Sequence, residues 1–177
     1  MAGESTIKPN PGNSHHEFTK ITLRPIELSD TDDFMVWATD DRVTKFCIWD
    51  TYTSRSQALD FITNFAIPHP WLRAVCLDDR AIGSISVSPN SGNNSCRAEL
   101  GYVLAHEHWG KGIATEAVKM VVSSIFGELP GLERLEAFVD VKNKGSQRGG
   151  RHSTLSSDIS GDGILHAGLV TVGAELG

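Results

Sequence analysis

A strand, a turn and the start of a helix follow one another in residues 97–117, RAELGYVLAHEHWGKGIATEA. The beginning of this run has strand composition, and residues 112–126 have helical composition with apolar side chains on one side. Gly110 and Gly112 permit a tight turn and a close approach of the backbone to a ligand. The free N–H groups of the turn and of the helix N-terminus form an anion site, to which Lys111 adds positive charge. A phosphate or a pyrophosphate is therefore the expected guest.

Two common phosphate-binding motifs do not describe this turn. The pattern G-x-x-x-x-G-K-[ST] is absent, and Gly110-x-Gly112 is followed by Thr115 where G-x-G-x-x-G requires glycine. On spacing alone, a purely structural turn between a strand and a helix is about as well supported as a phosphate site.

The segments around this run predict one mixed α/β domain. A capping-box pattern from Ser29 to Asp32 indicates the start of a helix. Ser54 begins a second helix with apolar periodicity, and Pro68 ends it. The expected strands cover residues 19–25, 71–77, 81–88, 97–104 and 134–141. The helix over 112–126 separates the last two strands, and this crossover implies parallel pairing within an otherwise antiparallel-rich sheet.

The composition limits the classes of function. The chain has 177 residues, of which 40% are hydrophobic and 21% charged, which suits one domain with a real core. The formal net charge of -6 argues against a general nucleic-acid binder. No apolar run is long enough for a membrane helix, and residues 1–18 lack a signal-peptide pattern, so we expect no membrane partner. Three separate cysteines without a CxxC pair suit a reducing compartment. We expect a cytoplasmic protein, with the nucleus also open.

The composition changes at Gly149. Seven of the 17 glycines lie from this residue onward, and every aromatic residue lies before it. We expect three parts: a disordered polar arm over 1–18, a domain over 19–148 and a poorly ordered tail over 149–177. Low order is expected from Gly149 to about Gly163, and residues 164–172 could form one strand or a short helix.

Several motifs of the chain, taken together, resemble the GNAT family of acyl-CoA-dependent N-acetyltransferases. They are residues 98–104 and 108–117, with ITLRP at 21–25 and VDVKNKGSQR at 139–148. The family signature Q/R-x-x-G-x-G/A is matched by Glu107-His-Trp-Gly-Lys-Gly112 except at its first position. The most similar branch acetylates the N-terminal alanine or serine of ribosomal proteins. The resemblance implies a mostly antiparallel GNAT-type sheet with a parallel splay and flanking helices.

The resemblance also implies acetyl-CoA as co-substrate, bound where the two parallel strands separate. Its pantetheine would pair with the backbone near Val103, and its pyrophosphate would lie on the turn from Glu107 to Gly112. Asn143 and Ser146 match positions that hold the pantetheine or the phosphates in the family. The coenzyme contacts expected on this basis are Val103, Leu104, Glu107, His108, Trp109, Gly110, Lys111, Gly112, Ile113, Ala114, Asn143 and Ser146.

The implied reaction is direct attack of a primary amine, from a protein N-terminus or a small molecule, on the thioester. A backbone N–H near Val103 would stabilise the oxyanion, and a carboxylate would remove the amine proton. Glu99 and Glu136 are the candidate bases. Glu99 is preferred because its strand leads directly into the turn. Alternatively, each could be an ordinary strand glutamate that is exposed or ion-paired and has no catalytic role. His106 and His108 form an HxH pair without an apparent third ligand, so no metal site is expected.

The chain departs from the family after Arg148, where the family continues with a helix and two strands. We find no matching motif there, and we expect the C-terminal helix and strands to be missing. The strand over 134–141 would then present an unpaired edge through which the chain could self-associate. An alternative function therefore stays open. The chain could be a catalytically impaired, truncated or splice isoform that retains acyl-CoA binding or acts as an interaction module.

Overall fold

The computed structural model of the chain describes residues 20–140, 142–143, 145–146, 155–159 and 164–169. In this part of the chain, seven strands form one sheet in the order β1-β2-β3-β4-β5-β7-β6. The β4–β5 pair is parallel, and all other neighbours are antiparallel. The strands are β1 (Ile21–Pro25), β2 (Leu72–Leu77), β3 (Arg80–Pro89), β4 (Arg97–Leu104), β5 (Arg134–Asp140), β6 (Leu155–Ile159) and β7 (Ile164–Leu169). The predicted mixed fold class, with its one parallel pair, is confirmed.

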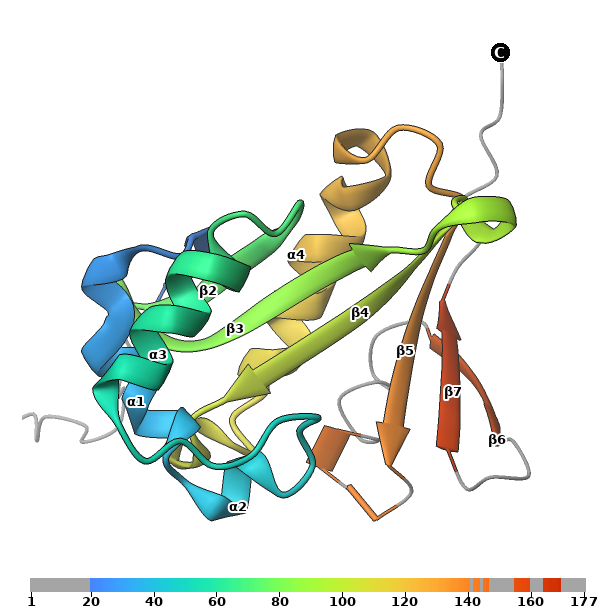
Figure 1. The fold of residues 1–177 in the computed structure, drawn as a ribbon. Coiled ribbons are helices and arrows are strands. Elements are labelled where there is room, and N and C mark those ends of the chain that lie inside the picture. Colours follow the sequence, from blue (N-terminus) through green and yellow to red (C-terminus); the bar gives the residue numbers. More distant parts are fainter. Residues whose placement is uncertain (1–19, 141, 144, 147–154, 160–163, 170–177) are drawn as a thin grey trace, which may run out of the picture.

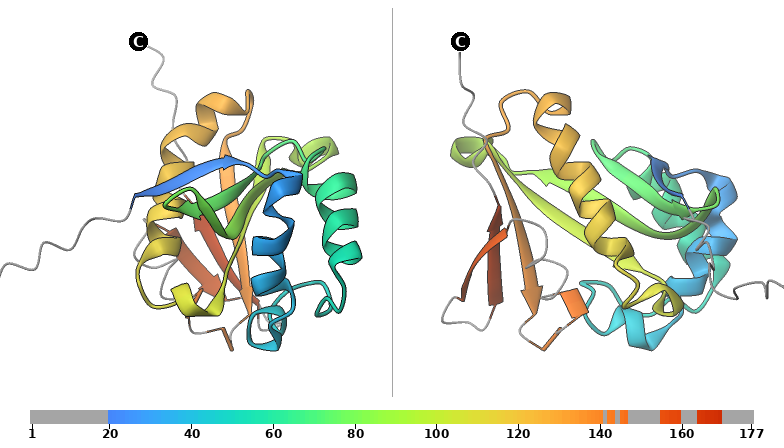
Figure 2. Two further views of the ribbon diagram at one scale, coloured as in Figure 1. Left: turned by 90° about the vertical axis from the view of Figure 1, so that its left-hand side faces the viewer. Right: turned by 180° about the vertical axis from the view of Figure 1, so that it is seen from behind.

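Helices cover both faces of the sheet, with the strands between them (Figure 2). On one face lie α1 (Thr31–Ala38), α2 (Asp41–Thr44) and α3 (Arg55–Phe61), which continues into the π-helical turn η2 (Ile62–Ala66). On the other face lies α4 (Ile113–Glu128). Three short 3-10 turns join these elements: η1 (Leu28–Asp30), η3 (Gly92–Asn94) and η4 (His106–His108).

Two buried clusters hold the helices to the sheet. Alternation along β4 places Leu100 and Leu104 in the cluster under α4, whereas Val103 packs against the cluster under α1 and α3. Trp37 and Phe34 are fully buried in this second cluster, with ring centroids 5.2 Å apart. Each such side chain contributes on the order of 2 kcal/mol through burial. The apolar residues that recur periodically in the sequence are therefore the residues that fill these two clusters.

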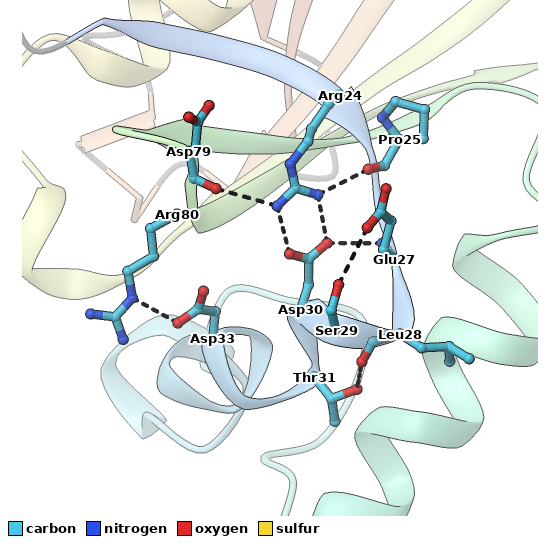
Figure 3. A network of polar contacts seen from close by, with 10 residues as sticks. All are labelled: Arg24, Pro25, Glu27, Leu28, Ser29, Asp30, Thr31, Asp33, Asp79 and Arg80. Atoms are coloured by element: carbon cyan, nitrogen blue, oxygen red, sulfur yellow. Dashed lines mark hydrogen bonds and ion pairs between the residues drawn. The ribbon is translucent and has the colours of Figure 1, made fainter.

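A polar network joins β1, α1 and the β2–β3 hairpin (Figure 3). The Arg24 guanidinium donates to both oxygens of Asp30, at 2.8 and 2.6 Å, and the backbone N–H of Glu27 donates to the same carboxylate at 2.8 Å. Burial by itself raises the pKa of Asp30, but these hydrogen bonds lower it below its usual value. The capping box at the start of this helical region is formed by Glu27 and Asp30, so the box predicted at Ser29 and Asp32 is wrong by two residues.

The sheet continues beyond β5, contrary to expectation. β7 pairs with β5 from Leu135↔Leu169 to Asp140↔Ile164, and β6 pairs with the far side of β7. The predictions of an unpaired edge on β5 and of two missing strands are therefore wrong. The predicted absence of a C-terminal helix falls on residues 141–154, most of which lie outside the described residues, as do the arm over 1–18 and much of the segment over 149–163.

Candidate functional site

β4 and β5 run side by side at one end and separate toward the other (Figure 1). Their registered pairs are Arg97↔Arg134, Ala98↔Leu135 and Glu99↔Glu136. Beyond these three positions, β4 continues to Leu104 and β5 to Asp140 without pairing to each other in the described strands. We call the paired part the closed end and the separated part the open end. The expected splay between the two parallel strands is therefore present.

Two hydrogen bonds fix which peptide groups of β4 face the open end. Asn90 N–H donates to the Arg97 carbonyl and Ala105 N–H to the Ile82 carbonyl, both at 2.9 Å. In an antiparallel strand, the N–H and C=O groups of one residue point to the same side, and successive residues alternate sides. The backbone N–H and C=O groups of the odd-numbered residues of β4 therefore face β3. The backbone of Val103 therefore faces β3.

The even-numbered residues of β4 point their backbone groups toward the open end. By this alternation, Tyr102 and Leu104 present N–H groups there. Of the two expected backbone contacts, Leu104 thus faces the open end and Val103 does not, and Tyr102 shares the orientation of Leu104. The orientation of the Tyr102 backbone was not predicted from the sequence, because the phase of the alternation depends on the pairing with β3.

The turn after β4 has the left-handed backbone that its glycines suggest. Gly110 has φ +74° and Gly112, the N-cap of α4, has φ +79°. Apart from the two flanking residues, no atom of the described residues lies within 4 Å of a Cβ built on either glycine. The backbone N–H groups of Ile113 and Ala114 occupy the first turn of α4, where helix geometry provides no intrahelical acceptor. The residues present therefore fit a phosphate or pyrophosphate group, and Lys111 is exposed beside them.

Trp109 links the turn to the end of β4. Its Nε1–H donates to the Leu104 carbonyl at 2.8 Å, and its ring centroid lies 4.9 Å from that of His106. The side chain is nonetheless 42% exposed. The indole thus spans the 3-10 turn η4 from the outside.

A small cavity lies behind the same turn. It has a volume of about 170 Å³, and its lining includes Trp37, Arg80, Glu107 and His108. Trp37 Nε1 and His108 Nδ1 are buried without a hydrogen-bond partner in the described part of the chain. His108 Nε2 lies 3.3 Å from the exposed Glu107 carboxylate. Glu107 and His108, which were expected to contact the coenzyme, therefore also line this cavity on the α1 side of the turn.

The two candidate bases differ in their partners. Glu136 accepts from Arg134 Nε at 2.6 Å, lies 3.5 Å from Arg97 Nη1, and has a side chain only 17% exposed. Glu99 is its register partner on β4 and is exposed. Glu136 therefore has the ion-paired structural role weighed as the alternative, and Glu99 is the more available carboxylate.

The segment after β5 lies beside the open end. Asn143 Oδ1 accepts from the Ser146 N–H at 3.1 Å, and the Tyr102 hydroxyl donates to the Ser146 carbonyl at 3.4 Å. Burial raises the pKa of Tyr102 above its usual value. The two residues expected to help hold the coenzyme are therefore brought to the strand that carries the open backbone groups.

Two kinds of site are not found in the described part of the chain. No group of three or more His, Cys, Asp or Glu side chains is arranged to hold a metal ion among the residues that the structure describes. None of the described helices combines the length and the apolar character that a membrane crossing requires.

Comparison with known proteins places this geometry in a family. The model of the acetyltransferase (GNAT) domain matches residues 20–151. The uncharacterized N-acetyltransferase p20 of Bacillus licheniformis is 35% identical over 130 residues, which are 70% of this chain and 72% of the relative.

Solved structures share the fold. A GNAT acetyltransferase from Bacillus anthracis superposes with a TM-score of 0.73 at 18% identity, covering 85% of this chain and 95% of the other. RimL, a ribosomal L7/L12 alpha-N-protein acetyltransferase solved with coenzyme A, gives 0.70 at 15% identity, covering 84% and 92%. Since the family model spans more than half of the chain and a curated relative agrees, the chain belongs to the GNAT family of N-acetyltransferases.

Proposed function

We propose that this chain transfers the acetyl group of acetyl-CoA to a primary amine by direct attack on the thioester. Acetyl-CoA-dependent transfer is the general reaction of the family. The observation that carries the proposal is one continuous surface. The backbone groups of Tyr102 and Leu104 face the open end of β4, and the strand runs directly into the left-handed turn at Gly110 and Gly112.

Two parts of the coenzyme, the pantetheine and the pyrophosphate, have residues suited to hold them. The pantetheine, with its amide groups, would pair with the backbone of Tyr102 and Leu104 in place of a strand neighbour. The pyrophosphate would accept hydrogen bonds from the N–H groups of the turn and the first turn of α4, beside Lys111. When bound, the coenzyme supplies an acyl group activated as a thioester.

The residues of the chain then handle one proton and one developing charge. Glu99 accepts a proton from the acceptor ammonium, directly or through water, because only the neutral amine has a lone pair for attack. As the C–N bond forms, negative charge develops on the carbonyl oxygen, and an N–H group of Tyr102 or Leu104 can stabilise it. The C–S bond would then break, and the second proton that the nitrogen must lose to become an amide would pass, directly or through water, to the leaving coenzyme thiolate.

The acceptor is proposed to be a protein N-terminus, as in the ribosomal-protein branch of the family, or a small amine. The net charge of -6 would favour the approach of a cationic acceptor through long-range attraction. The three free cysteines, Cys47, Cys76 and Cys96, suit a reducing compartment such as the cytoplasm.

A second candidate function follows from the sequence beyond Arg148, which carries no family motif. In this alternative, the chain is an impaired isoform that binds acyl-CoA and turns over poorly. The pairing of β7 with β5 removes the unpaired β5 edge on which self-association was based. The coenzyme turn supports acyl-CoA binding under both candidates, so catalysis must separate them.

The decisive experiment is calorimetric titration of acetyl-CoA, followed by a thiol-release assay with a panel of peptides and polyamines. Binding with thiol release supports the transferase, and binding without release supports the impaired isoform. No binding by the unchanged chain would overturn both candidates.

Gly110→Glu tests whether the turn is the coenzyme site. It places a side chain on a left-handed residue and adds negative charge at the turn, so binding should be lost. Gly92→Glu is the matched control. Gly92 has φ +63° with no described atom within 4 Å of its built Cβ, and it lies at the other end of β4, about 25 Å away by strand geometry. Unchanged affinity in Gly110→Glu would show that the coenzyme binds elsewhere.

A further inference from the structure

The peptide group that joins Leu104 to Ala105 is held from both sides. Its carbonyl oxygen accepts from Trp109 Nε1 at 2.8 Å, and its N–H donates to the Ile82 carbonyl at 2.9 Å. Because a peptide unit is planar, two bonds in opposite directions fix its orientation. This peptide is also the last one of β4, where the strand passes into the turn.

The backbone that follows has little intrinsic rigidity. Gly110 and Gly112 both adopt positive φ and lose more conformational freedom on ordering than other residues do. Trp109 stands directly before them, with an extended backbone at φ -69° and ψ 151°. Its side-chain bond therefore closes a short loop, from residue 104 to residue 109, directly before the two glycines.

We infer that Trp109 is a positioning residue that couples the two coenzyme-binding surfaces proposed above. The indole fixes the phosphate-binding turn relative to the open end of β4, so that one coenzyme molecule can engage both at once. This inference rests on the proposed function, because it takes the two surfaces as parts of one coenzyme site. The side chain is 42% exposed, so its role is not explained by core packing.

The coupling predicts an unequal loss of affinity in Trp109→Phe, which removes the Nε1–H and keeps an aromatic ring. Coenzyme A contacts both surfaces, and its dissociation constant should rise about tenfold, which corresponds to one hydrogen bond of about 1.4 kcal/mol. ADP carries the adenosine and the pyrophosphate but no pantetheine. It can therefore contact the turn but not the open end of β4, so its dissociation constant should change less than about twofold. The kcat at saturating acetyl-CoA should also stay within about twofold, because Glu99 is untouched, while KM for acetyl-CoA rises.

Trp71→Phe is the matched control. It removes another indole hydrogen bond, from Trp71 Nε1 to Glu128 at 2.7 Å, from a residue that is not assigned to the coenzyme. Thermal unfolding of both variants measures any general loss of stability. Calorimetric titration of coenzyme A and ADP into the unchanged chain and both variants measures the coupling.

The possible outcomes separate the inference from the function beneath it. A selective loss for coenzyme A in Trp109→Phe supports coupling. An equal loss for coenzyme A and ADP, no loss for either, or the same loss in Trp71→Phe overturns it, while the proposed site stands. If the unchanged chain binds no coenzyme A, the proposed function falls first and takes the coupling with it.

Discussion

The closed and open ends of the β4–β5 pair use the same two strands in opposite ways. At the closed end, Ala98 and Leu135 are fully buried register partners, and Arg97 and Arg134 surround Glu136. At the open end, the backbone groups of Tyr102 face no neighbouring strand in the described sheet. A ligand can therefore take the place of a strand only where the sheet stops pairing and its backbone groups stay exposed.

The largest expected effect separates the two glutamates of the closed end. Glu99→Gln should lower kcat by about 100- to 10,000-fold, because the amide cannot accept the amine proton. Glu136→Gln should leave kcat within a few fold and lower the free energy of unfolding by about 1 kcal/mol, because it weakens an ion pair. Thiol release at saturating substrates and thermal unfolding measure these effects. Full activity in Glu99→Gln would make this residue an ordinary exposed strand glutamate.

A side chain added at Gly83 should clash with the end of β4 that borders the open end. Gly83 is the register partner of Leu104, and a Cβ added to it would lie 2.2 Å from the Val103 carbonyl oxygen. Gly83→Ala should therefore displace the end of β4, reduce coenzyme affinity and lower the free energy of unfolding by about 3 kcal/mol.

Gly101→Ala is the matched control for this clash. Gly101 lies on the same pair of strands, and its added Cβ would lie 3.4 Å from Ser86 Oγ, close to ordinary contact. This variant should lose less than about 1 kcal/mol in urea unfolding. Equal losses at Gly83 and Gly101 would show that the tight contact is relieved by a small backbone shift.

The Arg24–Asp30 pair, which joins β1 to the start of α1, supplies a reference for electrostatic effects. The pKa of Asp30 is lowered in the folded chain, so its carboxylate stabilises the fold above the unfolded pKa, and this stability is lost as pH falls through the folded pKa. Asp30→Asn should therefore lower the free energy of unfolding by about 2 kcal/mol near neutral pH, with the difference vanishing in acid. Urea unfolding across the acid range measures it.

The control for this prediction is Asp32→Asn. Asp32 pairs with Arg55 at 2.7 Å, but its side chain is 79% exposed, so little stability depends on the pair. A constant difference between Asp30→Asn and the unchanged chain at all pH values would mean that packing, and not charge, explains the loss.

The smallest expected effect is on α4. Lys119 and Glu116 form an exposed pair at 2.8 Å with i,i+3 spacing. Lys119→Ala should change the free energy of unfolding by less than about 0.5 kcal/mol, because such pairs are weak and screened. A change several times larger in thermal unfolding would show that α4 depends on its surface charges more than on the buried face that packs under the sheet.

Local pattern was sufficient for the elements that carry the site. The run over 97–117 predicted the strand that the structure has at 97–104 and a helix that begins within one residue of Ile113. The Arg-x-Glu spacing that repeats at 97–99 and 134–136 was also visible, and it contained the signal for the ion pairs of Glu136. These features are local, so periodicity and motif were enough.

The features that the sequence did not predict depend on contacts with other parts of the fold. β6 was not predicted because residues 155–159 carry no apolar alternation strong enough to read, and their strand form depends on β7 beside them. The short helix α2 was missed for a similar reason, since four residues give no periodicity. Whether the backbone groups of Val103 or of Tyr102 face the open end depends on the pairing with β3, which no property of β4 alone specifies.

The three register pairs between β4 and β5 have a consequence for the order in which the chain folds. Everything up to Glu128 forms the first four strands, the cluster under α1 and α3 and most of the cluster under α4. This part leaves the ribosome before β5 does and can bury its apolar side chains first. We therefore expect amide hydrogen exchange to reveal two cooperative units, with β5, β7 and β6 opening together before the strands from β1 to β4.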